Sequence, residues 1–266
     1  MRLPDELVKE ILEPLLHLPE FLFIQNSYLS YLSLYLRCHR KPSPLLVCKA
    51  WCRVGTPLLY HDVVLRSQAQ ADALAHALMV APELGQWIRK LRVECAFSDQ
   101  AMQVIFRSCK RITDFCVMLT ATRGEVGGLY SALVDLNPAR LVLMTAADRR
   151  RKRQSASMLL ALCRAVPRWT SLKTVLHSSD HSDLPDGLVQ ALARAPNLST
   201  VVLTRPFHGV HREIRLFCAS PSVTAVIIRN NHHSSSRFTQ AYESEASYPV
   251  RQKLRFQTTG GRHSYR

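Results

Sequence analysis

Short apolar runs alternate with helix-like segments from residue 62 to residue 230. Six runs have the length, the Val, Leu and Ile content and the flanking turn residues that predict β-strands. Their central apolar residues are Leu91, Phe115, Leu141, Val175, Val201 and Val226. Because a segment with helical spacing of apolar residues lies between successive runs, the pattern predicts an α/β domain.

The spacing of the predicted strands indicates how this domain is built. Successive central residues are 24, 26, 34, 26 and 25 positions apart, and the longest step contains the charged insertion TAADRRRKRQ. A regular step of this size with one strand and one helix is typical of leucine-rich repeats. A doubly wound α/β sheet would show similar alternation, but no glycine-rich turn follows any predicted strand. We therefore expect a degenerate leucine-rich-repeat-like solenoid of alternating helices and short parallel strands over residues 62–230.

Residues 1–61 have a different pattern, which predicts a small all-helical unit. Leu3, Leu7, Ile11 and Leu15 recur at every fourth position, and Pro4 suits the first position of a helix. This unit carries more large apolar side chains than three short helices can bury among themselves. Some of them must therefore face the next domain or a partner.

A second helix is predicted to begin at Ser43, which can cap a helix, and Pro44, which fits its first turn. Its apolar positions are Val47, Ala50, Trp51 and Val54. Gly55 and Pro57 predict the end of this helix. A separate short helical turn is then expected over residues 57–60.

Residues 18–44 separate the two predicted helices and are expected to be an insertion. Its apolar part is confined to residues 21–36 and is followed by basic residues. This part is shorter than the roughly 20 apolar residues that a membrane span needs, although the basic flank resembles that of an anchor. An inserted loop with a marginal helix or strand is the preferred interpretation, and no membrane association is expected. At the other end, residues 231–266 are polar and basic, which predicts a disordered tail.

Charge and cysteine content narrow the functional classes only partly. The chain has 35 Lys and Arg against 20 Asp and Glu, a formal net charge of +15. Such a charge permits nucleic acid, an anionic membrane or an acidic protein as partner. The eight cysteines include no Cys-x-x-Cys pair, and the N-terminal residues do not have the pattern of a signal peptide. We therefore expect a reduced compartment, the cytoplasm or the nucleus.

Candidate chemistry in the sequence is weak. His177 and His181, with Asp180 and Asp183, could ligate a metal on a helix, but their Ser- and Asp-rich surroundings favour a loop. The sequence has neither a Gly-x-Ser-x-Gly elbow nor a phosphate-binding Gly-Lys-Ser/Thr loop. We therefore expect no enzymatic activity, no cofactor and no metal site. The cluster Arg149–Arg153 is consistent with a nuclear localisation signal, a phosphate-contacting loop or a solvated loop.

Two stretches, LPDELVKEIL and LLVCKAWCRVGTPLLY, together resemble the F-box motif. The first has its Leu-Pro-x-Glu-Leu start and Ile-Leu pair, and the second has its Leu-Val-Cys-Lys-x-Trp and closing aromatic residue. The phrases LGQWIRKLRVE, LNPARLVL and APNLSTVVL are similar to fungal F-box proteins with weak leucine-rich repeats. The insertion at residues 18–44 departs from the family pattern, in which a short link and a middle helix occupy this place.

The resemblance implies a non-catalytic substrate receptor of a Skp-cullin-F-box ubiquitin ligase. Its N-terminal helices would dock the Skp adaptor, and through it the cullin scaffold, while the repeats would bind a target protein. The docking residues carried over from the motif are Leu3, Pro4, Ile11, Leu12, Leu46, Val47, Cys48, Trp51, Leu59 and Tyr60. Given the positive charge, an acidic or phosphorylated target is expected. The alternative function is that of a basic nucleic-acid-associated nuclear protein; this is disfavoured because no aromatic residue is interleaved with Arg149–Arg153.

Overall fold

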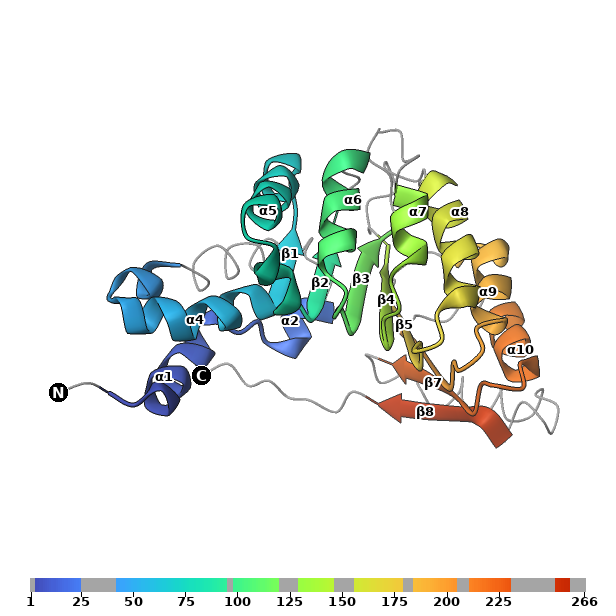
Figure 1. Cartoon of the computed structure of the whole chain (residues 1–266). Helices are drawn as coiled ribbons and strands as arrows, with labels where there is room; N and C mark the ends of the chain where they lie inside the picture. Colours follow the sequence, from blue (N-terminus) through green and yellow to red (C-terminus); the bar gives the residue numbers. More distant parts are fainter. Residues whose placement is uncertain are drawn as a thin grey trace.

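The computed structural model describes residues 3–24, 42–94, 98–119, 129–145, 156–178, 184–204, 211–230 and 252–258. Four helical segments come first: α1 (Asp5–Leu16), α2 (Glu20–Ile24), the short 3₁₀ helix η1 (Ser43–Leu46) and α4 (Lys49–His61). Strands and helices then alternate to the end of the described chain (Figure 1).

The strands are β1 (Asp62–Leu65), β2 (Lys90–Val93), β3 (Asp114–Met118), β4 (Arg140–Met144), β5 (Thr174–Ser178), β6 (Thr200–Thr204), β7 (Ala225–Asn230) and β8 (Leu254–Thr258). The helices between them are α5 (Gln68–Val80), α6 (Asp99–Ser108), α7 (Leu129–Val134), α8 (Ala156–Ala165), α9 (Asp186–Ala193) and α10 (His211–Ala219), with the 3₁₀ helices η2 (Pro82–Gln86) and η4 (Val166–Arg168). The chain is thus an α/β protein, as expected.

All eight strands form one parallel sheet in the order in which they occur in the sequence. Helices α5 to α10 lie along one face of this sheet (Figure 1). A doubly wound sheet reverses its strand order at a switch point and carries helices on both faces. The sequential order observed here excludes that alternative.

The six residues predicted at the strand centres form one continuous row across the sheet. Leu91 pairs in register with Phe115, and Phe115 with Leu141. The row continues through Val175, Val201 and Val226. Its members are all buried, because they pack beneath the helices in the main hydrophobic core. The register of the predicted strands is therefore confirmed residue by residue.

The row is longer at both ends than the sequence pattern predicted. Val63 of β1 pairs with Leu91, and Leu254 of β8 pairs with Val226. The expectation of a disordered tail over residues 231–266 is wrong at residues 252–258, where β8 completes the sheet. β8 is held because Leu254 is buried in the main core and Lys253 Nζ donates to the carbonyl oxygens of Cys218 and Ser220 at 2.9 and 2.8 Å. The rest of the predicted tail lies outside the described residues.

Two further expectations are corrected in the N-terminal region. The predicted insertion at residues 18–44 begins with a structured segment, because Leu18 and helix α2 are built into the protein core; residues 25–41 lie outside the described residues. Gly55 and Pro57 do not end the second helix, because α4 runs without interruption from Lys49 to His61. Within the described part of the chain, no helix is both long enough and apolar enough to cross a membrane.

Candidate functional site

Helices α1 and α4 cross and enclose a small apolar core of their own. Val8, Leu12 and Leu16 of α1 are buried in it. Half-buried residues from the other side complete the cluster: Leu45, Trp51, Val54, Leu58 and Leu59. This core is separate from the main core under helices α5 to α10. The N-terminal helical unit is therefore organised around its own packing contacts.

Gly55 allows the two helices to approach closely. A Cβ atom built at this position would lie 2.2 Å from Leu45 Cδ2, 3.0 Å from Leu12 Cδ1 and 3.2 Å from Leu16 Cδ1. Such distances are too short for ordinary carbon contacts. Gly55, which predicted a helix end, thus allows α1 and α4 to pack closely where they cross.

An ion pair at the surface joins the start of α1 to α4. The guanidinium of Arg53 donates to both carboxylate oxygens of Asp5 at 2.6 and 2.7 Å. These hydrogen bonds lower the pKa of Asp5 and raise that of Arg53. Because both side chains are well exposed, we expect the pair to add little stability.

The outer side of α1 is apolar although it faces solvent. Leu7, Ile11 and Leu15 of α1, and Leu3 just before it, are all exposed and recur at every fourth position. They lie next to the buried stripe of the same helix. At the end of η1, Leu46 is 85% exposed, and Val47, which follows it, is 63% exposed. Exposed apolar side chains thus lie on α1 and at the end of η1, both beside the small core. Such an apolar surface is typical of one that another protein covers.

The predicted docking residues fall into two groups. Six are exposed: Leu3, Pro4, Ile11, Leu46, Val47 and Cys48. The other four contribute to packing: Leu12 is buried, Trp51 and Leu59 pack in the small core, and Tyr60 packs against the main core. The predicted docking residues did not include Leu7 and Leu15, which share the exposed stripe of α1. Their regular spacing from Leu3 and Ile11 was the signal for them in the sequence.

A second feature was not predicted: the segment Leu18–Ile24 covers the face of the sheet opposite the helices. Leu18, Leu22 and Phe23 are buried against a row of alternating strand residues. The strand residues in this cluster are Cys116, Met118, Val142, Met144, Leu176 and Val202. Figure 1 shows α2 beside the first strands. Residues at the start of the chain thus fill part of the open face of the sheet.

Helix α2 is held at its C-terminal end by a buried arginine. Arg92 of β2 is fully buried, and its Nη1 donates to the carbonyl oxygens of Leu22 and Phe23 at 2.9 and 2.8 Å. Its Nε lies 2.8 Å from the carboxylate of Glu94. The guanidinium therefore satisfies carbonyl groups that the short helix leaves without an internal partner.

The N-terminal end of α2 is held by opposite charges. Glu20 pairs with Lys90 at 2.8 Å and with Arg140. Burial by itself would raise the pKa of Glu20, but the hydrogen bonds from Arg140 and Lys90 outweigh it and hold the pKa below its ordinary value. The ammonium of Lys90 also lies 5.7 Å from the ring centre of Phe23, within the range of a cation–π contact.

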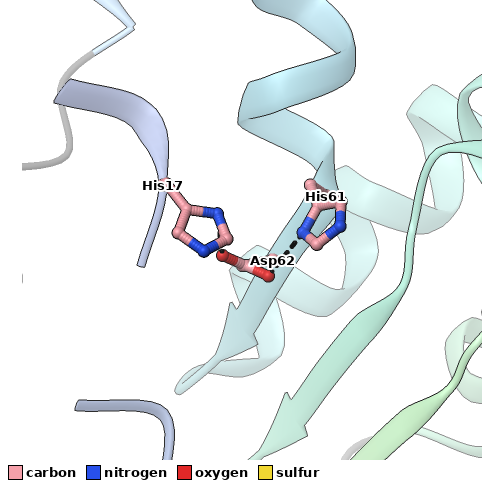
Figure 2. A group of neighbouring side chains, drawn as sticks. All are labelled: His17, His61 and Asp62. Carbon is pink, nitrogen blue, oxygen red and sulfur yellow. Dashed lines mark hydrogen bonds and ion pairs between the residues drawn. The ribbon is translucent and has the colours of Figure 1, made fainter. Parts of the chain in front are cut away.

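A third group of polar residues joins the helical unit to the sheet (Figure 2). Asp62, the first residue of β1, has a fully buried side chain. Its Oδ2 lies 2.9 Å from His17 Nδ1 and accepts the backbone N–H of Leu18 at 3.0 Å. Its Oδ1 lies 2.7 Å from His61 Nδ1. Among the described residues, this is the group whose ligand atoms, all within 4.8 Å of one another, could hold a metal ion.

The other candidate chemical groups do not come together in the described structure. His177 lies in β5 and is buried, while Asp180, His181, Asp183 and Arg149–Arg153 lie outside the described residues. Burial raises the pKa of the thiols of Cys109 and Cys116 to about 12. These two cysteines therefore stay protonated and act as small apolar side chains.

Comparison with known proteins adds no assignment. A scan against protein-family models finds no match, and a search of curated proteins finds no similar sequence.

Proposed function

We propose that this protein is a non-catalytic substrate receptor of a Skp-cullin-F-box ubiquitin ligase. The observation that carries the proposal is the exposed apolar surface of the helical unit, formed by the stripe on α1 and by Leu46 and Val47. In the F-box family, which the sequence motif resembles, the corresponding helices dock the Skp adaptor. On this proposal Leu12, Trp51 and Leu59 support the docking helices from within.

The sheet domain fits the second half of this function, the presentation of a target protein. Each unit has one strand and one helix, the strands stack in sequence order, and most predicted strand centres are 24 to 26 residues apart. These features support a degenerate leucine-rich-repeat-like solenoid. Repeat proteins commonly bind partners on the open face of the sheet. Here Arg92, Lys90 and Arg140 hold α2 over β2 and β4, and the buried cluster on that face extends across β3 to β6. We therefore propose that the target binds towards β7 and β8.

The charges at that end of the sheet fit an acidic or phosphorylated target. Arg255 of β8 pairs in register with Ile227 of β7, and Arg229 pairs with Gln257. Both arginines therefore lie on the open face, because their neighbours Ile228 and Leu254 point into the main core. Arg255 is exposed and Arg229 is half-buried. We expect target binding to weaken as salt rises from low to physiological concentration.

Adaptor binding is tested by co-expression of the full chain with the Skp adaptor, followed by purification and circular dichroism. The double variant Leu46→Ala, Val47→Ala should lose the adaptor while its spectrum is unchanged, because central apolar contacts are worth about 2 kcal/mol or more each. Met79→Ala, Val80→Ala is the matched control, since these residues of α5 are 61% and 72% exposed but lie outside the docking surface. Equal adaptor recovery for both double variants would overturn the proposal. The nucleic-acid alternative predicts salt-sensitive nucleic acid in place of adaptor and cullin in the purified material.

A further inference from the structure

We propose that His17, His61 and Asp62 form a binding site for a divalent transition-metal ion of the zinc class. Each ligand lies at an element boundary: His17 directly follows α1, His61 ends α4, and Asp62 begins β1. The three side chains thus meet where the helical unit joins the sheet (Figure 2). The proposal does not depend on adaptor docking.

The first argument is the charge of the buried carboxylate. The side chain of Asp62 is fully buried. Within the described part of the chain, the ionisable groups that contact its carboxylate are the imidazoles of His17 and His61, and no Lys or Arg pairs with it. A buried carboxylate is costly unless a positive charge compensates it. A divalent ion between the carboxylate and the imidazoles supplies that charge.

The second argument is the type and arrangement of the ligands. Two imidazoles and one carboxylate are a donor set that zinc and related divalent metals accept. Both Nδ1 atoms point at the carboxylate, at 2.9 Å for His17 and 2.7 Å for His61. The backbone N–H of Leu18 holds Asp62 Oδ2 at 3.0 Å and so orients the carboxylate in the way that outer partners orient metal ligands.

The geometry needs only a small adjustment to accept the ion. Two ligand atoms on a tetrahedral zinc ion lie about 3.3 Å apart, given zinc bonds of about 2.0–2.1 Å. The Nδ1 to carboxylate distances must therefore widen by about half an ångström. Both imidazoles can move, because their side chains are 39% and 38% exposed.

A metal ion at this site would fix the orientation of the helical unit on the sheet. It would link the ends of α1 and α4 to the first strand through bonds stronger than the present hydrogen bonds. An imidazole that carries its proton on Nε2 offers the lone pair of Nδ1 to a metal ion, so this tautomer suits coordination through Nδ1.

The test compares zinc retention by the full chain and by variants after chelation, incubation with zinc sulfate and desalting. The wild-type protein should retain about one zinc ion per chain more than the double variant His17→Gln, His61→Gln, and zinc should raise only the wild-type melting temperature. His76→Gln is the control, because His76 is an exposed histidine of α5 away from the site. The comparison subtracts any zinc bound by other histidines. Equal zinc content in the wild type and the double variant would show that these residues do not bind zinc.

A second measurement uses the wild-type protein alone, in case the double variant folds poorly. Diethyl pyrocarbonate modifies accessible imidazoles, and the modified residues are identified by mass spectrometry. Zinc should protect His17 and His61 from modification and leave His76 reactive. If His17 and His61 are modified equally with and without zinc, the three residues form only a hydrogen-bonded junction.

Discussion

The guanidinium of Arg92 donates a hydrogen bond to the carbonyl oxygen of Phe23 at 2.8 Å, although the two residues are far apart in the sequence. The bond joins the second strand of the sheet to the end of α2, and both residues are fully buried. A stretch that precedes the sheet in the sequence is thus part of its core. We expect the stability of the sheet and of the N-terminal segment to be coupled.

Replacing Arg92 tests this coupling. Arg92→Met should lower the free energy of unfolding by about 3 kcal/mol, because it leaves two carbonyl groups without their buried donor and leaves Glu94 with Arg66 alone at 3.5 Å. Amide exchange in Leu22–Ile24 should accelerate at the same time. Arg107→Met, at an exposed position of α6, is the control and should change stability by less than about 0.5 kcal/mol. An Arg92→Met protein as stable as this control would show that α2 is not coupled to the sheet.

Acid should weaken the attachment of α2 through Glu20. The folded-state pKa of this carboxyl is lowered from its ordinary value of 4.5 by Arg140 and Lys90. Its contribution to stability is therefore present above pH 4.5 and is lost as the pH falls through the lower folded-state value. In the Glu20→Gln protein, the urea concentration at the unfolding midpoint should change less between neutral and acid pH than it does in wild type. Glu83→Gln, at an exposed position of η2, should leave the profile as it is; identical profiles for both variants would contradict the role of Glu20.

Gly55 should tolerate alanine better than valine. Alanine gains about 1 kcal/mol of helix propensity and meets the movable tips of Leu45, Leu12 and Leu16. Valine adds two methyl groups at the same crossing and should cost about 1–3 kcal/mol of the stability of the helical unit. Thermal unfolding of both variants measures the difference. Ala73→Val on the exposed side of α5 controls for the β-branched side chain. If Ala73→Val and Gly55→Val lose equal stability, the close packing of α1 and α4 at Gly55 is not the cause of the loss.

Strand β8 should protect the edge of the sheet. Leu254→Lys places a charge in the main core, so amide exchange in β7 should accelerate and the free energy of unfolding should fall by about 2 kcal/mol. Gln252→Lys introduces the same charge at an exposed position just before the same strand and should have little effect. Slow exchange in β7 of the Leu254→Lys protein would mean that β8 does not hold this edge.

The sequence alone determined the repeating part of the fold. Periodic apolar residues identified six strands and even the residues that align across the sheet, from Leu91 to Val226. This succeeded because each strand of a stacked sheet must present its apolar centre to the same core, so one spacing repeats. The spacing within α1 likewise predicted the helix, and the structure divides its apolar residues into a buried and an exposed stripe.

Tertiary structure decided the features that depend on contacts between distant segments. Gly55 and Pro57 have the local signature of a helix end, but packing on α1 carries α4 through them. Helix α2 is too short for a periodic signal, and strand β8 has only two apolar residues, Leu254 and Phe256. Each is fixed by partners elsewhere in the chain: Arg92 and the cationic partners of Glu20 hold α2, and β7 and the main core hold β8. The meeting of His17 with His61 and Asp62 has the same origin, because only the crossing of α1 and α4 beside β1 brings them together. Local sequence encodes periodicity, whereas the pairing of single short segments is set by the free energy of burial and hydrogen bonding in the folded chain.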